Sequence, residues 1–368
     1  MIRVGLVGIG SVAENYISYF AEGKIEGAQI TALTSRNQAK ISKIAEKYHL
    51  TGIKQFERLE DMLEFGNVDA VIITTPNDLH ARMIEKTLMA NKHVLTDKPL
   101  GIKMSEVESL LSLSSLHPNL VSGVIFNRRS TEIYRRIRDL LRSGEIGDLR
   151  RAVWQTTNLY RTYDYYESNL WRGSFKTEGG GVLINQAIHQ LDTHLWLIGM
   201  PEKVLSLASE GFHRPVFTEN DISITMAYKG GATAQFMAST HEFPGTNRLE
   251  LSCDKGQVIV EDDSRLTIRL LEEKEEDFAR RQKGMSVKIP FVEYKEVVDE
   301  VPNEEQQRRL ISNFIAAILG KEELICPFSE GQNSIRLINA AYLSAWTQRA
   351  VPMDFDPLEY DRALALKN

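Results

Sequence analysis

The sequence predicts an α/β fold of two domains, the first built on a doubly wound parallel sheet and the second on a large, mostly antiparallel sheet. Short apolar runs alternate with amphipathic stretches up to about residue 120, and strand-like segments dominate residues 203–300. A chain of 368 residues is also too long for one ordinary core, so two domains of roughly 100–200 residues each are expected.

The first domain, expected at residues 1–122, alternates strands and helices. This pattern implies βαβ units whose helices cover both faces of a parallel sheet. The segment 68–73 has no polar residue after Asp69, as a strand covered on both faces should. Strands are expected at 3–7, 29–33, 70–74, 93–96 and 121–125, and helices at 12–21, 38–48, 79–90 and 106–114.

The second domain, expected at residues 123–368, changes to a strand-rich pattern. A helix from about residue 182 to residue 197 ends where Gly199 is followed by Pro201, because that order stops a helix. The charged run 271–282 is expected to be a solvated excursion. The other elements are helices at 131–141, 304–319 and 330–349, and strands at 149–157, 204–209, 221–228, 232–239, 248–253 and 256–261.

Composition restricts the class of protein. A formal net charge of −6 argues against a general nucleic-acid binder, which needs a basic excess. Cys253 and Cys326 are the only cysteines, so neither a disulfide framework nor a zinc-type spacing is expected. No apolar stretch is long enough to span a bilayer, and the first residues indicate a buried strand rather than a secretory signal. We expect a cytoplasmic protein without a membrane or nucleic-acid partner.

A glycine-rich turn, residues 8–13 (GIGSVA), follows the first strand and opens the first helix. The first glycine permits a tight turn, the second lets the backbone approach a pyrophosphate, and the small last residue allows helix and strand to pack closely. The phosphates then meet the helix N-terminus. Such a turn is weak evidence alone, but here it heads a βαβαβ pattern. We predict cofactor contacts at Gly8, Gly10, Ser11 and Val12; a purely structural glycine turn is the alternative.

The end of the second strand bears on the choice of cofactor. An NAD-selective site usually has Asp or Glu there to bind the ribose 2′-hydroxyl, but this chain has Thr34, Ser35 and Arg36. Arg36 can pair with a 2′-phosphate and Ser35 can donate a hydrogen bond to it, which favours NADP over NAD. An Arg36 that only stacks on adenine from the surface leaves NAD open. Ser35 and Arg36 are therefore assigned to the site of NAD or NADP.

Four further motifs, taken in order, resemble the Gfo/Idh/MocA family, which includes glucose–fructose oxidoreductase and inositol dehydrogenase. They are 75–80 (TPNDLH), 93–99 (HVLTDKP), 165–173 (YYESNLWRG) and 179–192 (GGGVLINQAIHQLD). The resemblance extends over nearly the full chain. It implies an N-terminal Rossmann domain and a C-terminal α/β domain whose large sheet often forms the oligomer contact. We expect a homo-oligomer, a dimer or a tetramer, built through that sheet.

Lys98 is the first candidate catalytic residue. Oxidation of a secondary alcohol needs a base for the proton and a positive group that stabilises the developing alkoxide. Lys98 follows an apolar strand and precedes Pro99, so it lies at the carboxyl edge of the sheet, where open α/β folds bind ligands. The resemblance implies that this lysine contacts substrate and cofactor. Asp97, also assigned to the cofactor site, stands where the family usually has Glu; a solvent-exposed lysine is the alternative.

His189 is the candidate base, because an imidazole with a pKa of about 6.5 suits proton transfer at neutral pH. Asn185, His189 and Asp192 are spaced i, i+4 and i+7 and share one helix face. The family usually has Asp at the position of Asn185, and an amide can orient a hydroxyl but cannot act as a base. Asp192 either orients His189 or accepts a helix-surface hydrogen bond. A structural His189 that caps a carbonyl is the competing interpretation.

Further contacts are expected around these residues. By resemblance, Thr75, Pro76, Asn77 and His80 lie near the nicotinamide ribose, with helix packing as the alternative for His80. The glycines 179–181 give the backbone freedom to pass close to a ligand. Aromatic faces and guanidinium groups before them suit a polyhydroxylated ring or an acidic group on it, although packing stays open for Trp171. The substrate residues are predicted to be Lys98, Arg161, Tyr166, Trp171, Arg172, Asn185 and His189.

These expectations combine into an NAD(P)-dependent dehydrogenase acting on a CH–OH group of a sugar, inositol or sugar derivative. Two alternatives stay open, namely a glycosidase of the same family that uses tightly held NAD, and a non-catalytic dinucleotide-binding regulator. No metal site is predicted, because the remaining histidines show no ligand spacing with Cys, Asp or Glu.

Overall fold

The computed structural model describes residues 1–168 and 171–367, and its contacts divide the chain into two compact units. The first unit comprises Met1–Ser130, Lys176–Gly179 and Pro302–Ile335, and the second comprises Thr131–Phe175, Gly180–Val301 and Arg336–Asn368. Each unit draws on three separate stretches of sequence. The domain boundary expected after residue 122 stays a prediction.

The first unit is built on six parallel strands in the order β3-β2-β1-β4-β5-β6. They are β1 (Ile2–Val7), β2 (Ala28–Thr34), β3 (Lys54–Phe56), β4 (Ala70–Ile73), β5 (His93–Thr96) and β6 (Ser122–Val124). The order reverses between β1 and β4, so right-handed crossovers place the helices that follow these two strands on opposite faces. Every residue of β4 is buried, as a doubly covered strand requires. The predicted doubly wound parallel sheet is confirmed.

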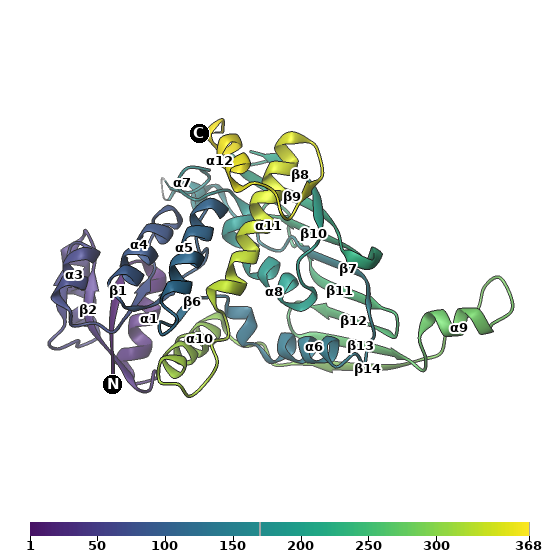
Figure 1. The fold of residues 1–368 in the computed structure, drawn as a ribbon, viewed down its shortest axis with the longest axis horizontal. Coiled ribbons are helices and arrows are strands. Elements are labelled where there is room, and N and C mark those ends of the chain that lie inside the picture. The colour runs from purple at the N-terminus through teal and green to yellow at the C-terminus, as the bar shows by residue number, and fades with distance from the viewer. Residues whose placement is uncertain (169–170, 368) are drawn as a thin grey trace. The chain divides into compact units, whose positions relative to one another are not determined.

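The helices of this unit are α1 (Ser11–Ala21), α2 (Gln38–Lys47), α3 (Leu59–Phe65), α4 (Asn77–Met89) and α5 (Met104–Leu116). Helices α4 and α5 pack side by side (Figure 1). The sequence analysis assigns no element to residues 49–67, where the structure has β3 and α3. Strand β3 is three residues long with two of them exposed, so it lacks the apolar run that identifies a strand.

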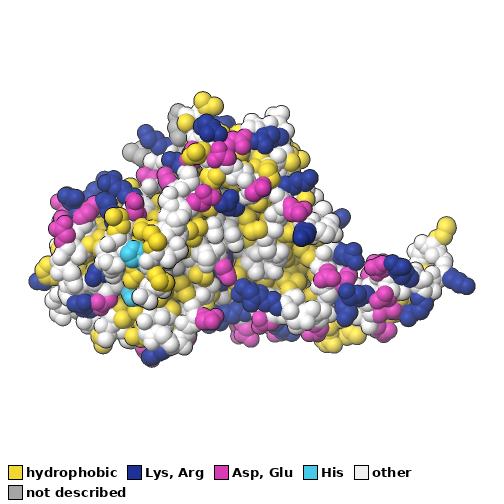
Figure 2. Space-filling model, in the orientation of Figure 1, with side chains coloured by type: hydrophobic (Ala, Val, Ile, Leu, Met, Phe, Trp, Pro, Cys, Tyr) yellow, Lys and Arg dark blue, Asp and Glu magenta, His cyan; other side chains and the backbone are white. Residues whose placement is uncertain are grey.

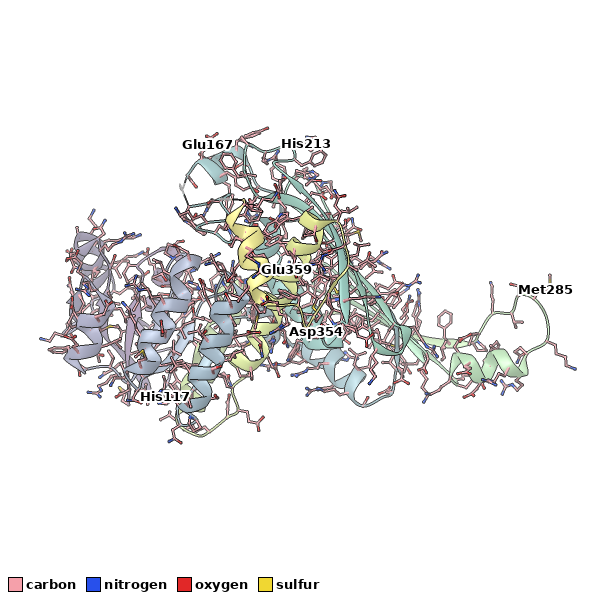
Figure 3. All side chains as sticks on the ribbon, turned by 45° about the horizontal axis from the view of Figure 1, so that its top comes forward. His117, Glu167, His213, Met285, Asp354 and Glu359 are labelled. Atoms are coloured by element: carbon pink, nitrogen blue, oxygen red, sulfur yellow. The ribbon has the colours of Figure 1, made fainter. Side chains whose placement is uncertain are left out.

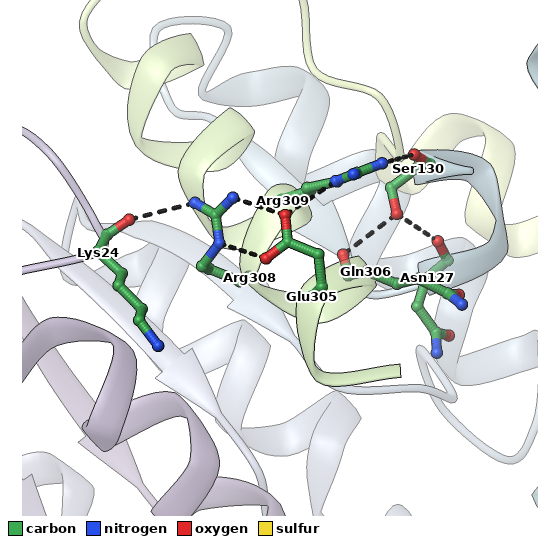
Figure 4. A network of polar contacts seen from close by, with 7 residues as sticks. All are labelled: Lys24, Asn127, Ser130, Glu305, Gln306, Arg308 and Arg309. Carbon is green, nitrogen blue, oxygen red and sulfur yellow. Dashed lines mark hydrogen bonds and ion pairs between the residues drawn. The ribbon is translucent and has the colours of Figure 1, made fainter. Parts of the chain in front are cut away.

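Helix α10 (Asn303–Ile318) folds with the N-terminal sheet although it lies far along the chain. Glu305 accepts two hydrogen bonds of 2.7 Å from Arg308 and one of 3.0 Å from Arg309 (Figure 4). These guanidinium groups lower the pKa of Glu305 to about 2. Arg308 also donates to the carbonyl of Lys24 and Arg309 to that of Ser130, both at 3.3 Å. The network therefore fastens α10 to two distant backbone segments of its own unit.

The second unit is built on nine strands in the order β14-β13-β12-β11-β7-β10-β9-β8-β15, of which only β7 and β10 pair in parallel. The large, mostly antiparallel sheet that the sequence predicts is confirmed. Its strands are β7 (Leu149–Thr156), β8 (Lys203–Glu210), β9 (Glu219–Ala227), β10 (Thr233–Ser239), β11 (Asn247–Cys253), β12 (Gly256–Glu261), β13 (Arg265–Leu271), β14 (Phe291–Val297) and β15 (Val351–Pro352).

Helices cover one face of this sheet. Helix α8 (Ile188–Ile198) packs on β7, and α6 (Glu132–Arg142) packs on α8. Trp154 of β7 and Phe236 of β10 point to that side and are fully buried, as alternation along a half-covered strand requires. The remaining helices include α7 (Tyr163–Glu167), α11 (Phe328–Thr347), whose residues are divided between the units, and α12 (Pro357–Ala365). Among the described residues, no helix combines the length and apolar character needed to cross a bilayer.

The segment after β13 is more ordered than the sequence predicts. The charged run 271–282, expected as a solvated excursion, contains α9 (Glu275–Arg281), in which only Phe278 is buried. The chain then returns along β14, an edge strand exposed at every residue. Figure 2 shows charges of both signs gathered over this projecting segment, and Figure 3 shows Met285 at its tip. The predicted exposure of the charged run is correct, whereas helix α9 and the strand pair β13–β14 were not predicted.

His194 of α8 is a polar residue in an apolar environment. Its ring is fully buried, with its centroid 6.2 Å from that of Trp154 and 6.0 Å from that of Phe236. In the part of the chain that the structure describes, neither ring nitrogen has a hydrogen-bond partner. Burial alone lowers the pKa of His194 to about 3, so the ring is uncharged at neutral pH.

We expect the free energy of unfolding to fall as the pH drops from about 6.5 towards 3, partly because of His194. Over that range the unfolded chain takes up a proton that the folded ring refuses, which costs up to about 1.4 kcal/mol per pH unit. Urea unfolding at several pH values should show a shallower dependence in His194→Leu than in the wild type. The matched change His213→Leu, at an exposed histidine, should keep the wild-type slope. Equal slopes for His194→Leu and wild type would contradict this assignment.

Candidate functional site

The glycine-rich turn lies where the strand order reverses. Gly8 follows β1 with φ +89°, and a Cβ there would be 2.7 Å from Thr75 Cγ2 and 2.9 Å from the Thr74 carbonyl oxygen. Thr74 Oγ1 donates to the Gly8 carbonyl at 2.6 Å, joining the turn after β1 to the turn after β4. Gly8 is therefore required both for its backbone conformation and for close packing.

Gly10 has a different environment. It precedes the first residue of α1, and a Cβ added to it would meet no atom within 4 Å. The helix that begins at Ser11, with Val12 in its first turn, has no side-chain cap from Gly10. An uncapped helix N-terminus beside open space is the arrangement that binds a phosphate through backbone N–H groups.

A cavity of about 800 Å³ opens beside this turn, within the range typical of ligand pockets. It brings together the ends of β1, β2, β3 and β4. Five residues predicted for the cofactor line it: Gly8, Ser35, Arg36, Thr75 and Pro76. The Ser35 amide donates to the Phe56 carbonyl at 3.0 Å, so the loops after β2 and β3 are held together.

Positive charge predominates around the cavity. Its lining includes four basic residues, Arg36, Arg58, Arg82 and Lys86, and two acidic residues, Glu57 and Glu60. Glu60 pairs with Lys86, and it lies 3.7 Å from Arg58 Nε. Arg36 is exposed and makes no ion pair with any described residue. A guanidinium group that is not neutralised within the protein suits an anionic ligand group at this place.

Lys98 lies at the carboxyl end of β5, as predicted. Its backbone N–H donates to Asp97 Oδ1 at 2.9 Å, and burial raises the pKa of the Asp97 carboxyl group. The Lys98 side chain is half-buried. Asp97 therefore organises the backbone at Lys98, in the turn where the family usually has the longer Glu.

His80 and Asn77 are both buried, and both contact backbone groups. His80 is 1% exposed, with Nδ1 2.6 Å from the Pro99 carbonyl and Nε2 2.7 Å from the Thr75 carbonyl. Burial lowers the pKa of the His80 ring. Asn77 Nδ2 donates to the Glu178 carbonyl at 2.8 Å. His80 thus links the turn after β4 to the turn after Lys98, and its predicted cofactor contact stays a prediction.

The candidate base lies on a largely buried helical segment of the second unit. The helix expected from about residue 182 begins as the π-helix η2 (Val182–Gln186) and continues as α8. The first part is a π-helix because the Ala187 N–H donates to the Val182 carbonyl, five residues earlier, at 2.7 Å. Single π-turns often mark functional sites. Of residues 180–195, all of which are described, every one is buried except Asn185 and His189. Two polar side chains, one turn apart, are therefore the accessible part of this segment.

The predicted aromatic and basic cluster assembles around Tyr165. The Arg172 guanidinium carbon lies 3.8 Å from the centre of the Tyr165 ring, and that of Arg161 lies 5.0 Å from it. The Tyr165 hydroxyl accepts from Asn185 Nδ2 at 3.1 Å. Tyr166 lies alongside and hydrogen-bonds to Thr240 at 2.9 Å. The cluster thus joins the segment before the glycine triplet to the helical segment after it.

Trp171 belongs to the same cluster, with its ring centre 5.7 Å from the Arg172 guanidinium carbon. Its neighbours in the motif, Asn169 and Leu170, lie outside the described residues. The arrangement presents planar rings and fixed positive charge beside Asn185, which is the chemistry that sugar hydroxyl and carboxylate groups need.

Two glycines of the triplet, Gly180 and Gly181, have a packing role inside the second unit. A Cβ at Gly180 would lie 2.1 Å from the Tyr342 hydroxyl, and a Cβ at Gly181 would lie 1.8 Å from the Glu219 carbonyl oxygen. The sequence analysis explains the triplet by freedom to approach a ligand. The structure adds that neighbouring protein atoms exclude side chains at both positions.

Two residues that the structure brings to these sites, Arg58 and Glu219, were not predicted from the sequence. Arg58 follows β3, a strand too short to be predicted, so nothing drew attention to it. Tyr165 was predicted as a member of the aromatic and basic cluster, and the structure places it at the centre of that cluster. Glu219 carries no local signal, because only the folded chain brings it to residues 181–183.

No group of three or more His, Cys, Asp or Glu side chains in the described part of the chain is arranged to hold a metal ion. Cys253 and Cys326 are both buried and free.

Comparisons with known proteins find relatives that match most of this chain. The chain is 27% identical over 350 residues to dTDP-3,4-didehydro-2,6-dideoxy-alpha-D-glucose 3-reductase of Saccharopolyspora spinosa, a match that covers 93% of this chain and 95% of the relative. It is 28% identical over 229 residues to inositol 2-dehydrogenase of Corynebacterium glutamicum, covering 58% of this chain and 62% of that protein.

A solved structure resembles the fold as a whole. The WlbA dehydrogenase from Bordetella pertussis, in complex with NADH and UDP-GlcNAcA, matches with a TM-score of 0.79 at 22% identity, over 96% of this chain and 99% of that one. At this identity the likeness concerns the fold.

Two family models match the sequence, one for each part of the chain. The model of the oxidoreductase family with an NAD-binding Rossmann fold matches residues 2–122, and the model of the GFO/IDH/MocA C-terminal domain matches residues 134–259. Together they cover more than half of the chain, and they agree with the motifs and with both sheets. The chain belongs to the GFO/IDH/MocA family of oxidoreductases, with an NAD-binding Rossmann fold.

Proposed function

We propose that this protein is an NAD(P)-dependent dehydrogenase that transfers a hydride between the nicotinamide and a hydroxyl or keto carbon of a sugar, inositol or sugar derivative. One observation carries the proposal. A family oxidoreductase retains a lysine at the carboxyl end of β5, and its helical segment 180–195 exposes only Asn185 and His189. The relatives named as a nucleotide-sugar reductase and an inositol dehydrogenase support the substrate class.

The residues around the first cavity fit a dinucleotide. The open space at Gly10 accommodates a pyrophosphate against the N-terminus of α1, near Ser11 and Val12. The loop after β2 offers Ser35 and Arg36 to the adenosine ribose. The turn after β4 offers Thr75, Pro76 and Asn77 to the nicotinamide end, near Asp97 and Lys98.

The chemistry divides between two residues. When bound, the nicotinamide ring accepts or supplies the hydride. His189 takes the proton from the substrate hydroxyl as a general base during oxidation and returns it during reduction. Lys98 stabilises the negative charge that develops on that oxygen. Asn185 orients the hydroxyl through its amide, because an amide cannot take the proton itself.

The aromatic and basic cluster supplies substrate specificity in this proposal. Tyr166 and Trp171 offer flat faces to a sugar ring, and Arg161 and Arg172 offer guanidinium groups to a carboxylate or hydroxyl groups on it. Arg172 is already oriented by a 2.8 Å hydrogen bond to the Tyr165 carbonyl. A prepared group of this kind loses less conformational entropy when a ligand binds.

The experiment that tests this function is a cofactor-reduction screen of the whole protein with NAD and NADP against sugars, inositols and nucleotide sugars, followed at 340 nm. Turnover with a polyol or sugar supports the proposal. Release of a free sugar without net reduction of cofactor indicates the glycosidase instead. Tight dinucleotide binding without turnover on the panel indicates the non-catalytic regulator, and either result contradicts the dehydrogenase.

We further propose that NADP is preferred to NAD, because Arg36 is exposed at the cavity without an ion-pair partner among the described residues. Arg36→Gln is expected to weaken NADPH binding about 10- to 100-fold, since a charge-assisted hydrogen bond contributes roughly 1.5–3 kcal/mol. The affinity for NADH should change little. Fluorescence titration of both cofactors measures this, and the exposed control Arg280→Gln should alter neither affinity. A wild type that binds NADH more tightly than NADPH contradicts the preference.

Assembly and location complete the proposal. Leu205 and Leu207 of β8 are 49% and 74% exposed and alternate with the buried Val204 and Ser206, so they lie on the uncovered face of the sheet. Exposed apolar groups on a sheet suit a second copy, so we propose a homo-oligomer formed through this sheet. A monomer in light scattering contradicts this assembly.

We also propose a cytoplasmic location, which accords with two free, buried cysteines. Secretion of the native protein would contradict this location.

A further inference from the structure

Glu219 is a buried carboxylate that the proposed chemistry does not use. It is the first residue of β9 and is 1% exposed. Its Oε2 accepts the Gly181 N–H at 2.8 Å, and its Oε1 accepts the Leu183 N–H at 2.9 Å and the Tyr342 hydroxyl at 2.8 Å. All four residues belong to the second unit. The Glu219 carboxylate thus accepts three hydrogen bonds, two of them from backbone N–H groups at the start of η2.

This environment suits the charged form, yet burial opposes it. In all three of these contacts the carboxylate oxygens accept, which favours a deprotonated Glu219. Removal from water is the larger effect and raises the pKa of Glu219 to about 7. Among the described residues Glu219 has no ion-pair partner, so no cation offsets the cost of burial. Its charge therefore changes within the neutral range.

The other titratable groups nearby do not take over this role. Tyr342 of α11 is the titratable side chain in contact with the carboxylate, and burial followed by the Glu219 charge raises its pKa far above the usual value. It therefore stays a hydroxyl donor. Asp221, two residues further along β9, pairs with His241 at 3.0 Å. The other ionisable residues of the helical segment are His189, Asp192 and His194 of α8, and His194 is uncharged at neutral pH because burial lowers its pKa to about 3.

The first turn of η2 leads directly to the candidate catalytic face. The Gly181 carbonyl accepts the Asn185 amide at 3.1 Å, and the Val182 carbonyl accepts the Ala187 amide at 2.7 Å, where α8 begins. His189 follows within the first turn of α8. A shift of Gly181 or Leu183 is therefore transmitted through one turn of backbone hydrogen bonds to Asn185, and through the next to His189.

We propose that Glu219 is a positioning residue, whose deprotonated carboxylate holds the first turn of η2 and thereby sets the orientation of Asn185 and His189. Proton uptake converts one oxygen into an O–H donor that opposes the surrounding donors, and so loosens the turn. The inference rests on the proposed function of Asn185 and His189. Turnover then depends on the protonation state of Glu219 as well as on that of the base, His189.

The activity test compares the pH dependence of kcat in the wild type and in Glu219→Gln. In the wild type, log kcat should fall on the acid side with a slope greater than one while Glu219 titrates, because two protonation events then lower kcat together. In Glu219→Gln the plateau should drop about tenfold and the slope should be one, because only the base still titrates. NADPH affinity should stay within twofold, since the proposed nucleotide residues lie in the other unit. The matched surface change Glu202→Gln should reproduce the wild-type profile. A purely structural Glu219 would lower kcat at every pH without altering the slope.

Tyr342→Phe provides a second variant that keeps the charge and both amide contacts. Loss of the hydroxyl donor raises the pKa of Glu219, so the steep part of the acid limb should move to higher pH and keep a slope greater than one. An acid limb that does not move contradicts the inference. This variant keeps the proposal testable if Glu219→Gln does not fold.

Hydrogen exchange tests the same inference without any substrate. After correction for intrinsic exchange rates, the amides of 181–183 should lose about tenfold protection between pH 8 and pH 6 in the wild type. In Glu219→Gln their protection should be low at both pH values. Unchanged protection contradicts the role of Glu219, whereas absence of turnover on every substrate contradicts only the proposed function.

Discussion

Replacement of Lys98 by Met is expected to lower kcat by about 10²- to 10³-fold, the usual effect of removing one electrostatic stabiliser of a developing oxyanion. Met has a similar length and no charge, so the turn after β5 keeps its packing while the developing alkoxide loses its counter-charge. The Asp97 hydrogen bond to the Lys98 backbone does not depend on the side chain and should persist. Steady-state kinetics with the substrate found by the screen measures the effect.

The position of Lys92 in the sheet provides a matched control for this prediction. Lys92 precedes β5 and therefore lies at the opposite, amino-terminal edge, so Lys92→Met should leave kcat within twofold of the wild type. His189→Ala should lower kcat by about 10²- to 10⁴-fold, because general base catalysis contributes that much. Full turnover in both Lys98→Met and His189→Ala would show that neither residue is catalytic.

Gly181→Ala is expected to destabilise the folded protein by about 3 kcal/mol or more, at the upper end of what overpacking costs. The added Cβ would lie 1.8 Å from the Glu219 carbonyl oxygen and 2.8 Å from Thr218 Oγ1. The first of these atoms belongs to the backbone of β9, which cannot move without breaking its strand pairing. Gly181 has a φ of −117°, so the effect is one of space rather than of backbone strain.

Gly10→Ala provides the matched control for this prediction. The same added methyl group meets no atom within 4 Å, so the free energy of unfolding should stay within about 0.5 kcal/mol of the wild type. The affinity for the dinucleotide should nevertheless fall, because that open space is the proposed place of the pyrophosphate. Urea unfolding and cofactor titration of both variants measure the contrast. A Gly181→Ala variant as stable as the wild type would contradict the packing argument.

Local sequence patterns predicted much of the fold because their signals are short-range. β5 and β12 coincide with the expected ranges, and most other strands of both sheets lie within two residues of them. Apolar runs bounded by turns are enough to locate such elements. β3 is missed because it is short and exposed, and β14 because charged residues interrupt its alternation. β13 alternates regularly and could have been predicted from its pattern.

The candidate site likewise contains some residues that local motifs predict and others that only the folded chain brings together. The turn at Gly8 and Gly10, the lysine after β5 and the pair Asn185 and His189 all come from contiguous motifs, since each depends on a strand end or a helix face. The place of Tyr165 at the centre of the basic cluster does not follow from a contiguous motif, because its partners lie 4 to 20 residues away along an irregular part of the chain.

By itself, the sequence determined the family, both kinds of sheet and the principal candidate residues, because glycine turns, apolar runs and helix spacing act over a few residues. Only the tertiary structure decided which surroundings those residues have. It brought α10 into the first unit, left Asn185 and His189 as the accessible side chains of a buried segment, and set Glu219 against the amides of Gly181 and Leu183. These outcomes depend on packing and burial between segments far apart in the chain, and burial is what moves the pKa of Glu219 into the neutral range.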